Sequence, residues 1–512
     1  MKTLNLSRRH ALTMFGALGA LALPPVGASS SSRTSSGGSA KPLHELSVRE
    51  ALIGLARRDF SASEYVQALL AWQENWKQLN AYVSQDRAAL HTAAQRADQA
   101  RHATHPLAGL PIALKDNIDL VGYVTTAGTP ALRNYRPRAT ALMLQHLIDQ
   151  GAIVMGKLGL HELASGGTCA NLTFGQIRNP YDLERIPGGS SGGTAVAVAA
   201  RLVPAALGTD TGGSCRLPAA LCGCVGFRPS AGRYDTRGVV PRAARRDTIG
   251  WMARSVADVE LLDAHSGRSS LPARPLELKG LRLGVPRSFF YQGCDAGVAQ
   301  VVEMALQRLR EAGAVLIEAD IPRLAELHKQ AVATGSTSFV QDLDRYLHDS
   351  AADVSIEQLV NAVADPQLRR SMQEGLKEYG ATTRERVRSA TQMVSVSLIE
   401  GERALAAAYT EYFAHQRLAA LVIPTSPIVA PPIPSDPAAG GSGTFLMVRN
   451  TGPSAAAGLP GLSLPAGLTT QELPVGIELD GPAGSDATLL RIAQQVEAVM
   501  PPLPAPHPPP NS

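Results

Sequence analysis

Aromatic side chains are scarce in this sequence, which limits the kind of hydrophobic core it can form. Only 4% of the 512 residues are Phe, Trp or Tyr, whereas 45% are hydrophobic and 18% are charged. These proportions are typical of a globular protein rather than a disordered one. We therefore expect a core of small and aliphatic side chains. The formal net charge is only +4 and is spread along the chain, so we expect no nucleic-acid partner.

Cysteine is sparse as well, and the number and spacing of the cysteines exclude two common roles. An odd number in a long chain does not describe a disulfide framework. Cys222 and Cys224 lack the spacing of zinc ligands and a second pair. We expect buried thiols that act as small hydrophobic side chains, and neither a metal nor an organic cofactor. The five are Cys169, Cys215, Cys222, Cys224 and Cys294.

The apolar run near the N-terminus, residues 11–23, is shorter than the about 20 residues that a membrane-spanning helix needs. Arg8 and Arg9 precede it, and Val26-Gly27-Ala28 follows it with the small-x-small pattern of a cleavage site. This order predicts a signal peptide of the twin-arginine type over residues 1–28. We expect a periplasmic or secreted protein with no stable membrane insertion after cleavage. An uncleaved N-terminal anchor is the alternative.

Composition divides the rest of the chain into three parts. Residues 29–41 are rich in serine and glycine, which predicts a flexible linker. Residues 42–500 contain no repeat and no clear internal linker, so we expect a single domain there. Residues 501–512 are rich in proline, and we expect this tail to be unpacked.

Helical and strand patterns alternate along this domain. The spacing of apolar residues predicts helices over 46–103, with capping boxes that begin at Ser47 and Ser61. Residues 110–114 and 152–155 have the length and composition of buried strands, with a helix between them over 139–150. This alternation predicts an α/β fold. Further helices are expected over 194–201, 296–315, 357–415 and 485–500, and further strands over 419–423, 462–465 and 475–479.

Two glycine-rich segments each contain a candidate nucleophile. Ser190 lies in Pro-Gly-Gly-Ser-Ser-Gly-Gly at 187–193, and Ser214 ends Gly-Thr-Asp-Thr-Gly-Gly-Ser at 208–214. Glycine permits unusual backbone angles and the close approach of a ligand. The unhindered N–H groups beside Ser214 could form an oxyanion hole. No lysine follows either segment, so neither is a phosphate-binding loop of the Gly-x-x-x-x-Gly-Lys type.

A second interpretation makes Ser190 the nucleophile of an α/β-hydrolase elbow, because Gly188–Gly192 fits Gly-x-Ser-x-Gly. A histidine base would then be needed, and the downstream candidates lie in no distinctive context. This interpretation also leaves the second glycine-rich segment unexplained. The candidate histidines are His265, His328, His348 and His415.

The sequence as a whole resembles the amidase signature family. The similar segments, in the family's order, are GLPIALKDNIDLVG at 109–122, TTAGTP at 125–130, PGGSSGGTAVAVAA at 187–200, GTDTGGSCRLPAALCGCVGFRPSAGR at 208–233, GLPGLSLPAGL at 458–468 and LPVGIELDGP at 473–482. The resemblance implies an α/β/α sandwich in which helices cover both faces of a large mixed β-sheet.

The resemblance also assigns roles to individual residues. Lys115 corresponds to the catalytic base of the family, Ser190 to a bridging serine that follows a cis peptide bond, and Ser214 to the nucleophile. The backbone N–H groups of Thr211, Gly212 and Gly213 correspond to the oxyanion hole.

A lysine can act as a base only if burial lowers its pKa from about 10.4 toward neutrality. Lys115 ends an apolar run and should point into the interior. Neighbouring side chains on a strand face opposite ways, so Asp116 need not pair with it.

The resemblance is greatest to mandelamide and indoleacetamide hydrolases. We therefore expect hydrolysis of a small primary carboxamide, with an apolar or aryl acyl side, to a carboxylate and ammonia through an acyl-enzyme. A subunit of the tRNA amidotransferase type that acts on glutamine, or a non-catalytic binding protein on the same fold, are the alternatives. The oligomeric state is open, with a homodimer as one option.

Overall fold

The computed structural model describes residues 41–99, 105–267, 276–332, 336–381, 390–436 and 444–509. The chain separates into Met1–Lys41 and a compact unit, Pro42–Ser512. The predicted signal peptide and nearly all of the predicted linker lie outside the described residues. Within the compact unit, no described helix is long and apolar enough to cross a membrane.

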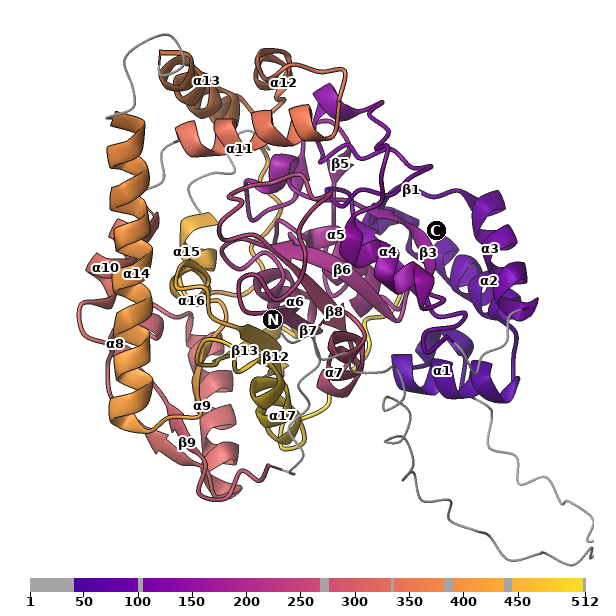
Figure 1. Cartoon of the computed structure of the whole chain (residues 1–512). Coiled ribbons are helices and arrows are strands. Elements are labelled where there is room, and N and C mark those ends of the chain that lie inside the picture. The colour runs from indigo at the N-terminus through magenta and orange to yellow at the C-terminus, as the bar shows by residue number, and fades with distance from the viewer. Residues whose placement is uncertain are drawn as a thin grey trace, which may run out of the picture. The chain divides into compact units, whose positions relative to one another are not determined.

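A mixed β-sheet runs through the compact unit (Figure 1). Its eleven described strands lie in the order β1-β3-β2-β6-β8-β7-β12-β13-β11-β9-β10. The parallel pairs are β2 with β3, β2 with β6, β9 with β10 and β9 with β11. The strands are β1 (Tyr82–Ser84), β2 (Pro111–Lys115), β3 (Ile153–Leu158), β6 (Ala205–Asp210), β7 (Val225–Arg228), β8 (Thr248–Ala253), β9 (Arg282–Gly284), β10 (Val315–Ile317), β11 (Ala420–Pro424), β12 (Gly461–Leu468) and β13 (Pro474–Asp480).

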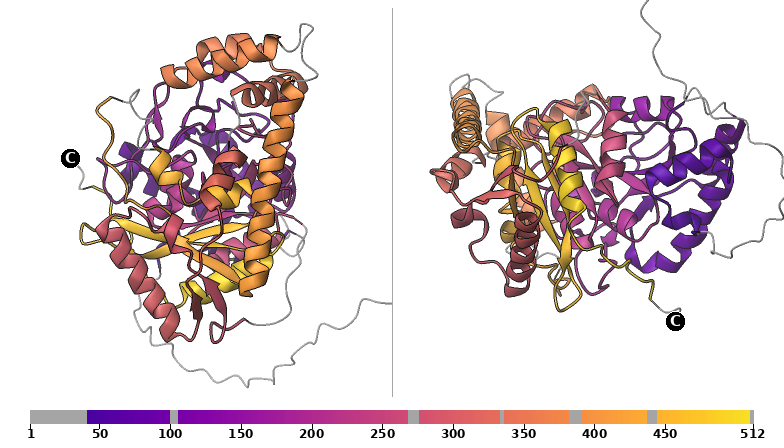
Figure 2. Two further views of the ribbon diagram at one scale, coloured as in Figure 1. Left: turned by 90° about the vertical axis from the view of Figure 1, so that its left-hand side faces the viewer. Right: turned by 90° about the horizontal axis from the view of Figure 1, so that it is seen from below.

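Helices cover both faces of this sheet, as expected (Figures 1 and 2). The short helix α5 contacts β6 and β2, and its neighbour α6 contacts β7, β12 and β13. The helices α7 and α17 form a second contacting pair. The described helices are α1 (Val48–Arg57), α2 (Ala62–Gln73), α3 (Arg87–Gln99), α4 (Leu142–Asp149), α5 (Gly192–Ala199), α6 (Arg216–Cys222), α7 (Val256–Ala264), α8 (Arg287–Phe290), α9 (Ala296–Glu311), α10 (Leu324–Val332), α11 (Ser336–Asp349), α12 (Ile356–Ala362), α13 (Pro366–Ala381), α14 (Ala390–Gln416), α15 (Thr444–Val448), α16 (Gly452–Ala456) and α17 (Asp486–Glu497).

The carboxyl ends of β2, β6 and β7 meet at one edge of the sheet, which we call the carboxyl edge. Asp210, at the end of β6, pairs with Thr248 at the start of antiparallel β8. Arg228, at the end of β7, pairs with Gly461 at the start of β12. Loops at the carboxyl ends of strands are where open α/β sheets bind ligands. Both glycine-rich segments flank α5 and β6, so the fold brings them toward this edge.

The helices α11, α12 and α13 pack over loops of the carboxyl edge. Their apolar residues form one cluster with Ala127, Leu132, Leu163 and Val240. In Figure 1 they lie together at the top, and the long helix α14, which contacts α10, runs down the left side. These helices therefore form a cap beside the loops that follow β2 and precede β8.

Most elements agree with the sequence patterns, and two details differ. Both predicted capping boxes are present, at the starts of α1 and α2. The predicted helical stretch 46–103 also contains the strand β1, which pairs with β3. The proline-rich tail was expected to be unpacked, and this is wrong for its described part. The hydroxyl of Tyr181 donates to the carbonyl of Pro504 at 2.9 Å, and Pro506 is buried.

Candidate active site

Lys115 is the last residue of β2 and its amine is buried at the carboxyl edge. Its Nζ lies 2.7 Å from Ser190 Oγ and 2.8 Å from Thr209 Oγ1. Ser190 precedes helix α5, and Thr209 lies on β6, the strand beside β2. The side-chain amide of Asn117 also donates to Thr209 Oγ1, at 3.2 Å. The amine is thus held by two hydroxyl groups rather than by a carboxylate.

The surroundings of Lys115 favour its neutral form. The residue has 0% solvent exposure, and burial lowers the pKa of its amine from 10.5 to about 8. The neighbouring Asp116 forms an ion pair with Lys157 instead, with 2.9 Å between Oδ1 and Nζ. The expectation that Asp116 points away from Lys115 is therefore confirmed. An amine with a pKa near 8 is partly neutral at physiological pH and can accept a proton.

Ser190 is fully buried and lies two residues before the start of helix α5. The peptide bond from Gly189 to Ser190 is cis, as the family resemblance implies. The carbonyl of Ser190 accepts the backbone N–H of His161 at 3.1 Å. Its hydroxyl is therefore fixed against the amine of Lys115 while its backbone is anchored elsewhere.

Ser214 lies in the loop between β6 and α6, adjacent to the segment that carries Ser190. The backbone N–H of Ser191 donates to the carbonyl of Ser214 at 3.3 Å, which ties the two glycine-rich segments together. Ser214 is only partly buried. Its hydroxyl makes no hydrogen bond to another residue in the part of the chain that the structure describes. This hydroxyl is therefore both accessible and uncommitted.

The loop before Ser214 presents two free backbone donors. Among the described residues, the N–H groups of Thr211 and Gly212 have no partner, whereas that of Gly213 donates to Asp210 Oδ1 at 2.8 Å. A Cβ built on Gly212 would meet no atom within 4 Å. Open space beside Gly212 and two free donors are the features that an oxyanion site requires. Of the three predicted oxyanion residues, Gly213 thus has its N–H engaged within the protein.

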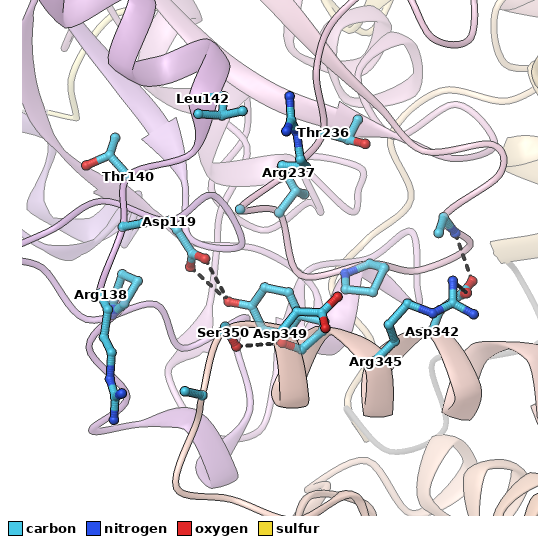
Figure 3. Close-up of a pocket in the computed structure, with 18 of the residues that line it drawn as sticks. Asp119, Arg138, Thr140, Leu142, Thr236, Arg237, Asp342, Arg345, Asp349 and Ser350 are labelled. Carbon is cyan, nitrogen blue, oxygen red and sulfur yellow. Dashed lines mark hydrogen bonds and ion pairs between the residues drawn. The ribbon is translucent and has the colours of Figure 1, made fainter.

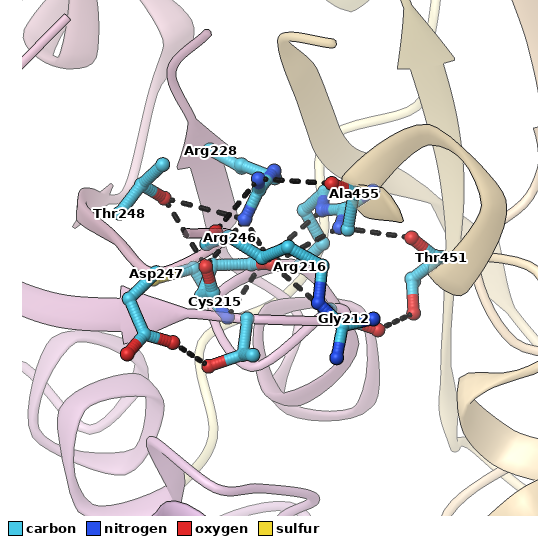
Figure 4. Close-up of polar contacts among 12 residues, drawn as sticks. Gly212, Cys215, Arg216, Arg228, Arg246, Asp247, Thr248, Thr451 and Ala455 are labelled. Carbon is cyan, nitrogen blue, oxygen red and sulfur yellow. Dashed lines mark hydrogen bonds and ion pairs between the residues drawn. The ribbon is translucent and has the colours of Figure 1, made fainter. Parts of the chain in front are cut away.

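A buried network of charges holds this loop in place (Figure 4). The carboxylate of Asp210 accepts the N–H groups of Gly213 and Cys215 and pairs with two fully buried arginines, Arg216 and Arg228. These pairs lower the pKa of Asp210. Arg216 also contacts Glu478 Oε1 at 2.5 Å, which joins the loop to β13. The loop geometry therefore depends on residues far apart in the sequence.

A second set of contacts fixes the outer side of the same loop. Thr451 Oγ1 donates to the carbonyl of Gly212 at 2.6 Å, and a Cβ on Gly213 would lie 1.9 Å from this oxygen. The hydroxyl of Thr211 donates to Asp247 Oδ1 at 2.5 Å. Glycine is required at position 213, which also has a φ of +126°.

The histidines that an α/β-hydrolase elbow would need lie elsewhere. None of them contacts Ser190 among the described residues, and the hydroxyl of Ser190 is bound to Lys115. Their own neighbours are Gln150 for His265, Phe289 for His328, Asp349 for His348 and Gln416 for His415. The elbow interpretation therefore has no base in this structure.

A cavity of ≈ 600 Å³ lies beside the cap at the carboxyl edge (Figure 3). Asp119 and Tyr346 both line it and contact each other: the tyrosine hydroxyl donates to both carboxylate oxygens, at 2.9 and 3.0 Å. Burial raises the pKa of Asp119 to about 6. The lining residues include Asp247 but none of Lys115, Ser190 and Ser214. The cavity therefore adjoins, through Asp247, the loop 211–214 that carries Ser214, the proposed nucleophile; we call this the nucleophile loop.

The cysteines are free thiols, and four of the five are buried, in agreement with their predicted role. Cys215 has 0% exposure and its side chain faces Gly208 and Gly250. Burial raises the pKa of Cys169 to about 11, which disfavours a reactive thiolate. The described residues contain no group of histidine, cysteine and acidic side chains that could hold a metal ion.

Comparison with known proteins places this chain in a family. The family model described as Amidase matches residues 64–490, and the chain belongs to this family of hydrolases. It is 40% identical over 460 residues to an indoleacetamide hydrolase from Agrobacterium vitis, covering 88% of this chain and 96% of that protein. It is 38% identical over 479 residues to a mandelamide hydrolase from Pseudomonas putida, covering 90% and 93%.

A solved structure gives the same assignment. The native peptide amidase from Stenotrophomonas maltophilia superposes with a TM-score of 0.76 at 29% identity, covering 91% of this chain and 99% of that one. The chain is thus an amidase by sequence and by fold.

Sequence patterns did not identify several residues that shape the site. Thr209, Arg228, Asp247 and Thr451 each contact a predicted site residue or its loop. Thr209 could have been suspected, because it precedes Asp210 on the strand that leads to Ser214, and adjacent side chains on a strand face opposite ways. Asp247 and Thr451 reach the loop from 36 and 239 residues away, and no local pattern indicates such contacts.

Proposed function

We propose that this amidase hydrolyses a small primary carboxamide, with an apolar or aryl acyl side, through an acyl-enzyme on Ser214. The observation that carries this proposal is the 2.7 Å contact between Ser190 Oγ and the buried amine of Lys115. The next residue, Ser191, is hydrogen-bonded to the backbone of Ser214. A serine becomes nucleophilic when a neighbouring group removes its proton. The three residues together supply the nucleophile, the relay and the base.

The first half of the reaction forms the acyl-enzyme. Ser214 Oγ attacks the amide carbon while its proton passes to Ser190 Oγ, and the proton of Ser190 passes to neutral Lys115. The negative charge that develops on the carbonyl oxygen is stabilised by the N–H groups of Thr211 and Gly212. Each donor of this kind contributes roughly 3–4 kcal/mol to transition-state stabilisation. The C–N bond then breaks, and the proton returns through Ser190 to the departing ammonia.

The second half releases the acid. Water attacks the acyl carbon, and its proton follows the same path through Ser190 to Lys115. The tetrahedral intermediate collapses, Ser214 regains its proton, and the carboxylic acid dissociates. Lys115 returns to its neutral form, so the cycle consumes only the amide and water.

The choice of substrate rests on the relatives. Indoleacetamide and mandelamide hydrolases are named for amides with aromatic acyl groups. The cap helices α11–α13 and the cavity beside them provide apolar and aromatic side chains near the nucleophile loop. These features favour an aryl acyl side over a long alkyl chain or a peptide.

A substrate panel tests the proposal. Purified protein should release ammonia from phenylacetamide, mandelamide or indoleacetamide, and the Ser214→Ala variant should release none. Activity confined to long-chain or peptidic amides would reject the substrate class. Activity confined to glutamine would instead favour the tRNA amidotransferase alternative.

We also propose that residues 1–28 direct export through the twin-arginine route, on the strength of Arg8, Arg9 and the small residues before position 29. Fractionation followed by N-terminal sequencing tests this. A mature protein that begins near residue 29 outside the cytoplasm is expected, and an intact N-terminus in the cytoplasmic fraction would contradict it.

A further inference from the structure

Arg242, in the loop before β8, carries a guanidinium group that has no ion-pair partner among the residues that the structure describes. Its Cζ lies 4.3 Å from the centroid of the Phe339 ring on α11. Within the described part of the chain, this guanidinium makes no hydrogen bond and no ion pair. Burial lowers its pKa to about 10, so the group still carries a positive charge at neutral pH. A partly buried charge without a partner is costly, and such a group in an enzyme suggests a ligand.

The nearby carboxylates are already engaged. Asp247 Oδ1 accepts the Thr211 hydroxyl, and Asp247 Oδ2 accepts the backbone N–H of Arg242 at 2.8 Å. Asp342 Oδ2 accepts the backbone N–H of Ala244 at 3.0 Å.

Glu402 is the remaining acidic group beside this loop, and it is shared by two other arginines. It pairs with Arg245 at 3.2 Å and with Arg246 at 3.9 Å. The positive charge of Arg246 also acts on Arg242. The negative charge of Asp247 acts on Arg242 as well, but among the described residues no carboxylate lies within ion-pair distance of its guanidinium. Of the three arginines in this loop, Arg242 is therefore the one without an ion pair in the described part of the chain.

Arg242 is tied to the nucleophile loop through Asp247. One carboxylate oxygen of Asp247 holds the hydroxyl of Thr211, and the other holds the backbone of Arg242. Thr211 is three residues before Ser214. Figure 4 shows Asp247 beside the loop that contains Gly212. The backbone of Arg242 is thus joined through one carboxylate to the loop that carries Ser214.

We propose that Arg242 binds a carboxylate on the acyl side of the substrate. Phe339 covers one face of the guanidinium, which leaves its planar N–H donors at the edge free for a two-point contact with a carboxylate. The preferred substrates are then primary amides whose apolar or aromatic acyl group ends in an ionised carboxyl group. This inference rests on the proposed function and adds a specificity-determining residue to it.

A matched pair of amides tests this subsite. Phenylacetamide and 4-carboxyphenylacetamide differ only in the remote carboxylate. The wild-type enzyme should have a kcat/KM at least about tenfold higher for the carboxylated amide. Arg242→Met should lower that value about 10- to 100-fold, because hydrogen bonds to charged groups contribute about 1.5–3 kcal/mol, and should leave phenylacetamide within about twofold.

Two variants control for indirect effects. Arg245→Met removes an exposed arginine from the same loop and should change neither value. Arg242→Lys keeps the charge but loses the planar donors, so it should retain part of the preference. If Arg242→Met does not fold, the preference measured for Arg242→Lys tests the subsite instead. A wild-type preference for phenylacetamide, or an unchanged ratio in the Arg242 variants, would overturn the inference.

Binding of the product separates this inference from the proposed function. Calorimetry with 4-carboxyphenylacetate should show binding to the wild type that Arg242→Met weakens about tenfold or more. If neither amide is hydrolysed, the proposed function fails, but the calorimetry still shows whether Arg242 binds a carboxylate. No binding to the wild type, or equal binding to both proteins, would overturn the inference.

Discussion

At the scale of single residues, the site depends on how the amine of Lys115 is surrounded. Two hydroxyl groups contact it, the adjacent carboxylate of Asp116 turns away to Lys157, and solvent is excluded. Each of these features favours the neutral amine over the ammonium ion. In the proposed mechanism, one buried lysine and two serines take the place of the histidine base of other serine hydrolases.

The pH dependence of the reaction should follow the pKa of Lys115. Because the proposed mechanism uses the neutral amine, and its pKa is lowered to about 8, kcat/KM should rise about tenfold per pH unit below pH 8 and level off above it. Lys115→Met should lower kcat/KM about 10²- to 10⁴-fold and remove this slope. The control is Lys77→Met, an exposed lysine, which should leave the profile unchanged. A wild-type profile that stays flat from pH 6 to 9 would be incompatible with the lysine base.

At this scale the sequence predicted those site residues that lie in short local motifs. The serines of the two glycine-rich segments and the lysine that ends an apolar strand were predicted together, and the structure brings the lysine and Ser190 into contact. The burial of Lys115 followed from the apolar run before it. The engagement of the Gly213 N–H by Asp210 was not predicted, because it depends on the curvature of the loop rather than on its composition.

At the scale of elements, the loop between β6 and α6 is defined by what its glycines allow. Gly213 has a φ of +126° and lies against Thr451, whereas Gly212 faces open space. The two adjacent glycines therefore differ in kind: one is required by backbone geometry and packing, and the other only by the space that a substrate needs.

Alanine substitutions of these glycines should differ in their effects on stability. Gly213→Ala places a Cβ 1.9 Å from Thr451 Oγ1 and should lower the free energy of unfolding by about 1–3 kcal/mol. Gly212→Ala meets no atom within 4 Å and should leave it within about 0.5 kcal/mol of the wild type. Urea denaturation measures both. Equal stability of the two variants would show that the loop is not held as described.

The elements that sequence patterns predicted well are those with strong local signals. Capping boxes located the starts of α1 and α2, and an unbroken apolar run located β2. The three-residue strand β1 was missed, because its identity comes from pairing with β3. The described part of the proline-rich tail was expected to be unpacked, yet its backbone contacts Tyr181. Composition does not reveal that kind of contact.

At the scale of the whole molecule, a buried ion cluster connects the nucleophile loop to the C-terminal strands. Arg216 pairs with Asp210, and with Glu478 across 262 residues of sequence. Burial raises the pKa of Glu478 well above its usual value, so this carboxyl depends on the guanidinium for its charge. The position of the loop that carries Ser214 is thereby coupled to the pairing of β12 and β13.

Removal of the central arginine should destabilise the whole molecule. Arg216→Met leaves Asp210, Glu478 and Asp480 without their shared partner, and breaking a buried pair from one side costs about 3–5 kcal/mol. We expect a matching loss in the free energy of unfolding. Arg287→Met, which breaks a partly exposed pair with Glu303, should cost less than about 1 kcal/mol. Similar losses in the two variants would contradict the importance of the buried cluster.

The general architecture was predictable from the order of the segments, which resembles a known family, but the long-range contacts were not. Arg228, Thr451 and Glu478 come from three different parts of the chain and meet at one loop. None of them lies in a pattern that distinguishes a network residue from an ordinary buried one. Only the folded sheet brings them to the same part of the molecule.

The transfer of a proton from Ser214 through Ser190 to Lys115 is tested most directly by covalent labelling of the nucleophile. A fluorophosphonate should label the wild-type protein on Ser214 alone, as located by peptide mass spectrometry, at a rate that rises with pH to about 8. Ser190→Ala and Lys115→Met should each slow this labelling about 10²-fold or more, and Ser214→Ala should abolish it. Labelling at another residue, or an undiminished rate in the Ser190 and Lys115 variants, would contradict the relay.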